Sequence, residues 1–437
     1  MKLNKNWNIL ENSKKLYING AFHIIVGTFI TKFTSLFGTI FLIRLLSKND
    51  FGNLSYLENI YGYLYLFAGM GLSYSIIRFL LKANSIEEKQ ALYYHILKKS
   101  SFINIGIVFI AVLSILLIPN LAQLSELKYL ALILLLSLPF QYIVDINHLT
   151  NRAMLANKRY AFTIVLVALF YVGIKVVLTS TLGLNGSVLA NLVVYTTLSI
   201  ILTVLNHKSF FKSDIIQSYS IPLKTKKDIF SYSLQFMVTN GLWLMFYLND
   251  IFFLGLFGSN LIIADYKAAY IIPANLSIIS VSIGVFISPY FIKNENNHVW
   301  IRANFTKLIL FISILLFIIS FAIWIFAHTI VSILYGEAYL NSVNYMRLII
   351  IGMFINSSMR YTISNLLSAM GHVRSNLVVS ITGVVTQVFL LFLIVPKYSV
   401  TGLILVDIIV YFGMTVALFT IFTIKYFKQK GGITSVN

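Results

Sequence analysis

The sequence predicts an all-α membrane protein with about twelve transmembrane helices in two pseudo-symmetric six-helix lobes. Three observations lead to this fold class: the composition, the spacing of apolar stretches and an internal repeat. Of the 437 residues, 58% are hydrophobic and 11% are charged, whereas soluble domains carry about 25% charged residues. The mean hydropathy is +0.85. This composition excludes an ordinary soluble protein.

Apolar stretches of about 20 residues, long enough for a helix to cross about 30 Å of hydrocarbon, recur along the chain. The first six are residues 21–46, 54–77, 102–118, 129–149, 161–180 and 186–205. The second six are residues 229–257, 261–292, 308–327, 343–369, 377–395 and 401–424. These stretches lack the strict alternation of barrel strands. They predict an N-terminal lobe over residues 1–205, a cytoplasmic linker over 206–228 and a C-terminal lobe over 229–437.

The positive charge of the chain indicates membrane topology. The formal net charge is +19, but the Lys and Arg residues form short tracts between the apolar stretches, which argues against a nucleic-acid partner. Because cytoplasmic loops retain cations, the distribution places both termini in the cytoplasm. The stretch after the basic residues 1–15 is too long for a signal-peptide core, so we expect it to be retained. The chain has no cysteine, which excludes disulfides and thiolate metal sites.

The two halves of the sequence repeat at an offset of 216 residues. Ala153 and Met154 correspond to Ala369 and Met370, Lys158 to Arg374, Gly186 to Gly402, and Asn191 to Asp407. Chance alignment of apolar segments is the alternative, although glycines and cations match as well as hydrophobicity does. Two halves of six helices each have the same orientation, an arrangement that transporters use for alternating access.

Three stretches of the chain carry motifs of one known family. The first contains Arg44-Leu45-Leu46, Asp50-Phe51-Gly52, Gly69-Met70-Gly71-Leu72 and Ile76-Ile77-Arg78. The second contains Asp250, Leu254-Gly255, Tyr266 and Ala269, although Ala264-Asp265-Tyr266 lacks the glycine that usually precedes this tyrosine. The third contains Leu334-Tyr335-Gly336-Glu337-Ala338-Tyr339 and Ala369-Met370-Gly371-His372. Together these stretches resemble the polysaccharide-exporter and oligosaccharide-flippase (Wzx-type) branch of the multidrug/oligosaccharidyl-lipid/polysaccharide (MOP) exporter superfamily.

This resemblance implies a fold similar to that of multidrug and toxin extrusion (MATE) transporters, and a transport function without catalytic residues. The expected substrate is an undecaprenyl-diphosphate-linked oligosaccharide, the repeat unit of O-antigen in lipopolysaccharide biosynthesis, of capsule or of exopolysaccharide. The expected activity is flipping from the cytoplasmic to the outer face of the bacterial inner membrane. Expected partners are this lipid-linked substrate, membrane lipids, and the polymerase and chain-length machinery of the pathway.

Ionisable residues inside apolar spans are functional candidates, because an unpaired charge is costly in hydrocarbon. Lys32 lies near the middle of the first span, and Thr28, Ser35 and Thr39 share its helical face. We expect it to line the substrate cavity; the alternative is a buried lysine that is neutral or paired with an acid such as Glu58.

Arg360 lies inside the tenth span between Asn356 and Ser364, each one turn away. Arginine stays charged and binds phosphate with two hydrogen bonds. Lys32 and Arg360 are therefore our anion-binding candidates, which could hold a diphosphate from the two lobes.

Polar residues also follow one side of the seventh span at intervals of three to four residues: Gln235, Thr239, Trp243, Tyr247 and Asp250. We expect this stripe to face the cavity, with Trp243 and Tyr247 stacking on sugar rings. Asp250 is predicted to be a counter-ion to a lysine or a protonatable coupling site. Glu58 shares a face with Gly62, Tyr65 and Gly69, so close helix packing explains it nearly as well as a cavity role.

Other charged residues lie nearer the ends of their spans. Snorkelling or a local ion pair is expected for Lys175, Lys267 and Asp407, and interfacial anchoring for Asp145, His148 and Arg152. No cofactor is expected, but export could be coupled to H⁺, Na⁺ or the membrane potential. A potential that is negative inside favours outward movement of two phosphate charges by about 4 to 5 kcal/mol per 100 mV.

Rival functions are a membrane polymerase or ligase, a multidrug exporter of the same superfamily, and a peptidoglycan-precursor flippase. The first usually shows a long external loop, and the sequence has no metal-ligand cluster or catalytic triad pattern. A multidrug exporter would favour acidic cavity residues over Lys32 and Arg360. Peptidoglycan-precursor flippases tend to carry two further helices.

Overall fold

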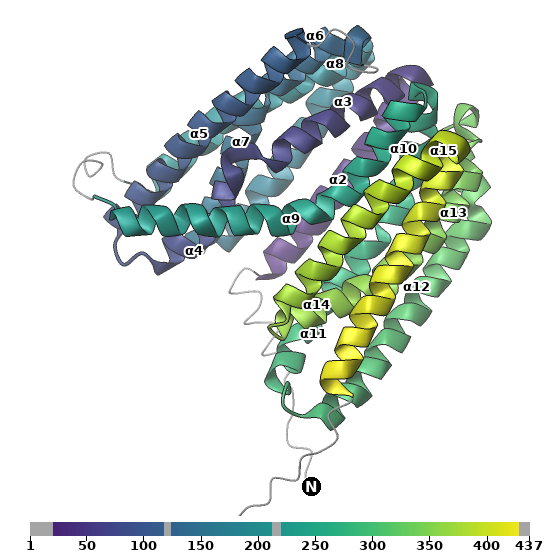
Figure 1. Ribbon diagram of the computed structural model, residues 1–437. Helices are drawn as coiled ribbons and strands as arrows, with labels where there is room; N and C mark the ends of the chain where they lie inside the picture. Colours follow the sequence, from purple (N-terminus) through teal and green to yellow (C-terminus); the bar gives the residue numbers. More distant parts are fainter. Residues whose placement is uncertain (1–20, 118–123, 212–219, 428–437) are drawn as a thin grey trace, which may run out of the picture. The chain divides into compact units, whose positions relative to one another are not determined.

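The computed structural model describes residues 21–117, 124–211 and 220–427, and all regular elements within these ranges are helical (Figure 1). Some expectations lie outside the described residues: the basic segment 1–15, the middle of the predicted linker, and the predicted cytoplasmic C-terminus at residues 428–437. The described residues form two compact units. We describe each unit by itself.

The boundary between the units passes through two helices, Lys48–Leu66 and Leu223–Phe257. The N-terminal lobe comprises Met1–Asp50 and Leu57–Gly241, and the C-terminal lobe comprises Phe51–Tyr56 and Leu242–Asn437. Residues 51–56 pack within the C-terminal lobe, where Gly52 lies against the backbone of Asn260 and the Tyr56 ring lies against Gly255. A larger side chain in place of either glycine would collide with these neighbours.

The N-terminal lobe contains the first six predicted spans. Its elements are α2 (Ala21–Leu45), α3 (Lys48–Leu66), the 3₁₀ turn η1 (Ala68–Gly71), α4 (Leu72–Lys82), α5 (Ile86–Leu117), α6 (Leu124–Leu136), α7 (Leu138–Ala153), α8 (Asn157–Phe210) and the first part of α9 (Leu223–Phe257). The chain bends by 45° between α3 and α4, where Gly69 and Gly71 have positive φ angles. The 54-residue α8 turns back on itself at Gly183 and so contains two spans.

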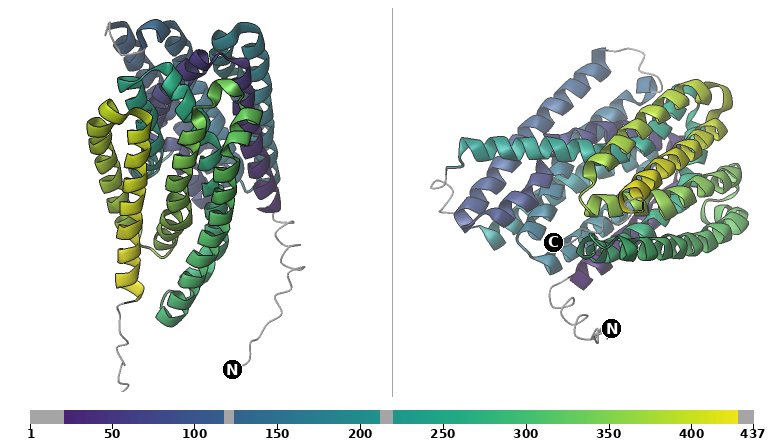
Figure 2. Two further views of the ribbon diagram at one scale, coloured as in Figure 1. Left: turned by 90° about the vertical axis from the view of Figure 1, so that its right-hand side faces the viewer. Right: turned by 60° about the horizontal axis from the view of Figure 1, so that its bottom comes forward.

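The C-terminal lobe contains the other six. The remainder of α9 is followed by α10 (Asn260–Ala274), α11 (Leu276–Lys293), α12 (His298–Leu334), η3 (Glu337–Tyr339), α13 (Ser342–Ile355), the π-helical η4 (Asn356–Tyr361), α14 (Thr362–Ala369) and α15 (Val373–Tyr426). α13 packs against α10, α12 and α15, and α12, α13 and α15 lie side by side in Figure 2. α15 reverses at Ser399 and holds the last two spans. The predicted fold of about twelve helices is confirmed.

The internal repeat is visible in the backbone. α8 and α15 both contain 54 residues, begin at Asn157 and Val373, and are interrupted by non-helical conformations at Gly183 and Ser399. Both pairs of positions differ by the offset of 216 residues. The pseudo-symmetric pair of lobes predicted from the sequence is therefore confirmed.

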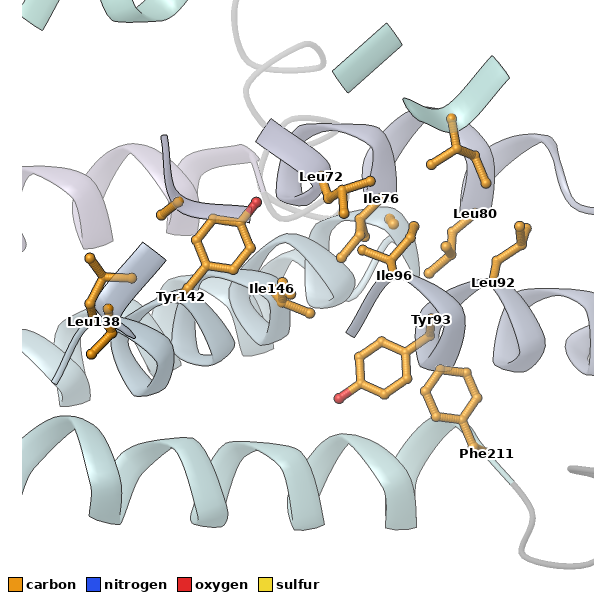
Figure 3. Packing of buried hydrophobic residues seen from close by; sticks show 14 residues of the cluster. Leu72, Ile76, Leu80, Leu92, Tyr93, Ile96, Leu138, Tyr142, Ile146 and Phe211 are labelled. Carbon is orange, nitrogen blue, oxygen red and sulfur yellow. The ribbon is translucent and has the colours of Figure 1, made fainter. Parts of the chain in front are cut away.

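A buried apolar cluster fixes α4 within the N-terminal lobe. Leu72, Ile76 and Leu80 recur every four residues along α4 and pack against side chains of α5 and α7, including Tyr93 and Tyr142 (Figure 3). The hydroxyl of Tyr142 accepts the backbone N–H of Ser73 at 2.8 Å. This bond satisfies a donor at the start of α4, where no preceding turn can do so.

Large apolar side chains cover the outside of the helices. Along α2, Phe29, Phe33, Phe37 and Phe41 are all exposed, and α12 exposes Phe317 and Phe321. Eight described helices are long and apolar enough to cross a membrane, and the bent α3–α4 pair adds a ninth. An apolar exterior of this extent is stable in lipid but not in water. The chain is a multi-pass membrane protein.

Candidate functional site

Two buried carboxyl groups meet in the C-terminal lobe. Gln387 on α15 donates its side-chain nitrogen to Oδ1 of Asp250 at 3.0 Å and to Oδ1 of Asp407 at 2.8 Å. The same nitrogen lies 3.1 Å from the carbonyl oxygen of Phe246. Tyr266 donates its hydroxyl to Oδ2 of Asp250 at 2.7 Å. One amide thus holds the two carboxyl groups next to each other.

Among the described residues, this carboxyl pair (Asp250 and Asp407) has no cationic partner. Within residues 21–117, 124–211 and 220–427, no Lys, Arg or His nitrogen forms an ion pair with either group. Two adjacent buried carboxylates cannot both stay charged at low cost, so such a pair typically shares a proton or holds a cation. The prediction that Asp407 snorkels or forms an ion pair is wrong. The reversal at Ser399 places Asp407 inside the lobe beside Gln387.

Arg360 lies in a cage of aromatic rings in the same lobe. Its side chain is 3% exposed, and its guanidinium carbon lies over the rings of Trp243 at 4.6 Å, Phe246 at 5.2 Å, Tyr361 at 5.4 Å and Tyr411 at 5.6 Å. The negative ring faces stabilise the cation without neutralising it. In the described part of the chain Arg360 has no carboxylate partner within 4 Å.

A π-helical turn carries Arg360. Residues Asn356–Tyr361 form this turn between α13 and α14, and such wide turns are frequently found at functional sites. The predicted stripe Asn356, Arg360 and Ser364 is only partly connected. Arg360 donates to Oδ1 of Asn356 at 2.5 Å, but Ser364 hydrogen-bonds Asn376 at 2.8 Å.

The aromatic residues of the predicted stripe pack against other protein rings at a tilt. The centroids of Trp243 and Tyr361 are 4.4 Å apart, and those of Tyr247 and Tyr270 are 4.9 Å apart. Phe246 joins the two parts of the site, since its carbonyl accepts from Gln387 and its ring lies beside Arg360. The arrangement combines a buried cation, aromatic faces and two adjacent carboxyl groups.

The N-terminal lobe contains the equivalent cluster with a different charge arrangement. Lys175 donates to Oε1 of Glu58 and to the hydroxyl of Tyr171, both at 2.8 Å, and Tyr171 donates to Oδ1 of Asn191 at 2.8 Å. By the repeat, Tyr171 and Asn191 correspond to Gln387 and Asp407. A lysine of the chain neutralises the acid here. The expectation of a local ion pair for Lys175 is confirmed.

Lys32 is exposed on α2. Gly27 and Gly38, which lie on another face of this helix, pack against Ala161 and Val172 of α8. The suggested pairing of Lys32 with Glu58 is not found, because Glu58 binds Lys175. The anion-binding role of Lys32 stays a prediction.

The remaining candidates lie in the N-terminal lobe. Gln235 is exposed on the first part of α9 and lines a polar cavity with Arg78 and Tyr232. Asp145 accepts the Tyr65 hydroxyl, and Arg152 lies 5.5 Å from the centre of the Tyr160 ring. These contacts hold the end of α7 in place.

Comparison with known proteins agrees with this architecture. A family model described as polysaccharide biosynthesis protein matches residues 17–295. Lipid II flippase MurJ in an inward closed conformation is similar in structure, with a TM-score of 0.71 at 15% identity over 92% of this chain and 87% of that chain.

Two other solved structures are also similar. A MATE family multidrug resistance transporter in an inward-facing conformation gives a TM-score of 0.67 at 17% identity over 90% of this chain and 93% of that chain. A MOP superfamily transporter from Pyrococcus furiosus gives 0.63 at 16% identity over 94% and 95% of the two chains. No curated protein matches in sequence. At these identities the structural similarity concerns the fold.

Proposed function

We propose that this chain, which belongs to the polysaccharide biosynthesis protein family of the MOP exporter superfamily, flips an undecaprenyl-diphosphate-linked oligosaccharide across the bacterial cytoplasmic membrane. The oligosaccharide is the repeat unit of a surface polymer such as O-antigen, capsule or exopolysaccharide. Movement from the cytoplasmic to the outer face proceeds by alternating access of the two lobes. The chain acts as a transporter and catalyses no bond formation.

The burial of the Arg360 cation in a cage of aromatic rings is the observation that supports this proposal most. Burying a cation is expensive unless it has a partner, and the aromatic cage supplies only part of the stabilisation that a carboxylate would give. A diphosphate is the missing partner in this proposal. Guanidinium binds phosphate oxygens through two parallel hydrogen bonds, and rings such as Trp243 are suited to the apolar faces of sugars.

The carboxyl pair is proposed to couple transport to an ion. Protonation, or binding of Na⁺, would relieve the repulsion between Asp250 and Asp407, and release would restore it. Because Phe246 contacts both Gln387 and Arg360, a change at the pair would be transmitted to the cage. The membrane potential would assist export of the anionic headgroup.

The test is transport by the full-length protein in proteoliposomes that contain polyprenyl-diphosphate N-acetylglucosamine. Arrival of the sugar on the outer leaflet is measured with an added, membrane-impermeant galactosyltransferase that modifies only exposed N-acetylglucosamine. We expect wild type to expose the sugar much faster than empty vesicles, and Arg360→Gln to be strongly impaired. Arg347→Gln is the matched control, since Arg347 also lies over a tryptophan, 5.2 Å from the ring of Trp324.

Other outcomes of this assay separate the rival functions. Wild-type rates equal to those of empty vesicles would overturn the flippase proposal. Preference for lipid II over other lipid-linked sugars would assign peptidoglycan synthesis instead. Efflux of cationic drugs without movement of the sugar lipid would favour a multidrug exporter.

A further inference from the structure

The polar cavity that Gln235 lines lies in the N-terminal lobe, where α4 ends and α9 begins. It has a volume of about 330 Å³ and is lined by Arg78, Phe79, Lys82, Asp228, Ser231, Tyr232 and Gln235. Small-molecule sites begin at about 300 Å³, so the space is enough for a sugar with its phosphates. We call it the α4–α9 cavity.

Both walls of the α4–α9 cavity are fixed by packing. Arg78 and Lys82 are one turn apart on α4, whose other face lies in the buried cluster of Figure 3. On the opposite side, Ile229 of α9 is buried in the same cluster. Gly71 lies against the backbone oxygen of Ser233, where no larger residue would fit. The cavity is therefore formed by helices that are held together beneath it.

The cations of the cavity are oriented but not neutralised. The guanidinium carbon of Arg78 lies 4.5 Å from the centre of the Tyr232 ring, and Phe79 packs edge-on against the same ring. Neither Arg78 nor Lys82 forms an ion pair with any described residue, Asp228 included. Both are exposed. Two cations on one helix face, one of them held over an aromatic ring, suit a diphosphate.

The opposite wall offers hydrogen-bonding groups at helical spacing. Asp228, Ser231 and Gln235 follow each other at intervals of three and four residues on α9, and all three are exposed. Their carboxylate, hydroxyl and amide groups can accept and donate bonds to sugar hydroxyls. A phosphoethanolamine headgroup is a poorer match, because it has no hydroxyls for these groups to bind.

We infer that the α4–α9 cavity binds the glycosyl diphosphate headgroup of a lipid-linked sugar before transport. Arg78 and Lys82 bind the diphosphate, Asp228, Ser231 and Gln235 bind the sugar, and Tyr232 is a positioning residue for Arg78. This inference rests on the proposed function. The cavity lies at the cation-rich end of the lobe, which the sequence predicts to face the cytoplasm, where such precursors are assembled.

Binding is tested by calorimetry on the purified full-length protein. The probes are farnesyl-diphosphate N-acetylglucosamine, inorganic diphosphate and uridine-diphosphate N-acetylglucosamine. We expect the farnesyl probe to bind most tightly, and Arg78→Gln or Lys82→Gln to weaken it about tenfold through loss of a charge-assisted bond. Lys227→Gln is the control, because Lys227 is an exposed cation beside Asp228 that does not line the cavity. It should bind as wild type.

Further variants test the assigned roles. Tyr232→Leu should weaken diphosphate binding, whereas Tyr232→Phe should keep it because the ring remains. Gln235→Leu should weaken binding of the glycosyl probe and leave binding of inorganic diphosphate unchanged. If wild type binds inorganic diphosphate as tightly as the farnesyl probe, the sugar assignment is overturned. If it binds the uridine compound as tightly as the farnesyl probe, the lipid-linked assignment is overturned.

The inference and the proposed function can fail separately. The cavity inference is refuted if Arg78→Gln and Lys82→Gln bind the farnesyl probe as tightly as wild type, or if Lys227→Gln loses as much affinity as they do. Neither result would contradict the proposed transport function. The protein could also bind the farnesyl probe tightly and in an Arg78-dependent way but move no sugar in proteoliposomes. That result would support the cavity inference and refute the flippase proposal. If both hold, Arg78→Gln should raise the substrate concentration for half-maximal transport.

Discussion

Gly183 and Ser399 adopt nearly the same unusual backbone conformation at equivalent places in the two lobes. Their φ and ψ angles are 59° and −135° in α8, and 49° and −135° in α15. Glycine adopts positive φ readily, whereas a residue with a Cβ is strained there. The same sharp reversal is thus made without strain in the N-terminal lobe and at some cost in the C-terminal lobe.

We expect Ser399→Gly to stabilise the protein by about 1 kcal/mol and Gly183→Ser to destabilise it by about 1–2 kcal/mol, because the two changes remove and introduce this strain. The thermal unfolding midpoint of the purified protein in detergent should rise in the first variant and fall in the second. Gly173→Ala and Gly413→Ala are controls, since both positions are helical and have no neighbour within 4 Å of an added Cβ. A fall for Ser399→Gly would contradict the strain argument.

The sequence was sufficient to predict the spans and the repeat, because apolar length and matched glycine positions do not depend on tertiary contacts. Residues 161–180 and 186–205 were separated correctly on either side of Gly183. The polar site was harder to predict. Gln387 is an isolated amide in an apolar helix, and only the repeat, which aligns it with Tyr171, could have indicated its role.

Asp407 shows why position along a span is a weak guide to chemistry. Its distance from the middle of the span suggested snorkelling, but the partner that decides its role, Gln387, lies on the other half of the same hairpin. Similarly, the sequence shows Arg78 as a cation and Tyr232 as an aromatic residue, but it does not show that they are in contact. Their contact joins α4 to α9, which are separated by most of the lobe in sequence.

The ion pair of Glu58 and Lys175 should be asymmetric in its response to mutation. The side chain of Lys175 is 4% exposed and that of Glu58 is 32% exposed. Glu58→Gln leaves a buried ammonium, which we expect to cost about 3 kcal/mol, whereas Lys175→Met leaves a carboxylate that can reach water and should cost about half as much. Thermal unfolding in detergent measures both.

The double variant provides the internal check. Removing both charges should restore much of the stability that Glu58→Gln loses, because no unpaired ion remains. Glu126→Gln, at an exposed acid of the same lobe, should change little. Equal losses for the two single variants, with strict additivity in the double variant, would show that the pair is not coupled.

His372 should make stability depend on pH. It lies between α14 and α15, with Lys425 Nζ 3.0 Å from its Nδ1 and the Tyr426 hydroxyl 2.9 Å from its Nε2. Burial and the Lys425 charge lower the pKa of His372 below its usual 6.5, while Glu295 opposes this shift. The unfolded chain then binds more protons than the folded one, so stability should fall as pH drops below about 6.5.

The unfolding midpoint measured between pH 7.5 and 5 checks this dependence. His372→Gln should flatten the curve in the acidic range, because the glutamine does not titrate. His328→Gln, at an exposed histidine of α12, should retain the wild-type slope. A wild-type slope in His372→Gln would assign the acid sensitivity to other groups.

The carboxyl pair should control the response of transport to ion gradients more than it controls the fold. Asp250→Asn or Asp407→Asn removes one of two adjacent charges, so each should leave stability within about 1 kcal/mol of wild type or raise it. If the pair exchanges a proton or Na⁺, sugar exposure in proteoliposomes should lose its dependence on the pH or Na⁺ gradient in both variants. Gln387→Leu should instead cost about 2–3 kcal/mol, because it leaves the buried acceptors of Asp250, Asp407 and Phe246 without their donor.

The control for this prediction is Asp265→Asn in the same lobe. Asp265 is buried and accepts the hydroxyl of Ser342 at 3.1 Å, so its loss changes a buried acid without touching the pair. Gradient dependence should persist in this variant. If it also persists in Asp250→Asn and Asp407→Asn, the pair has only a structural role, and coupling must arise from the membrane potential acting on the anionic headgroup.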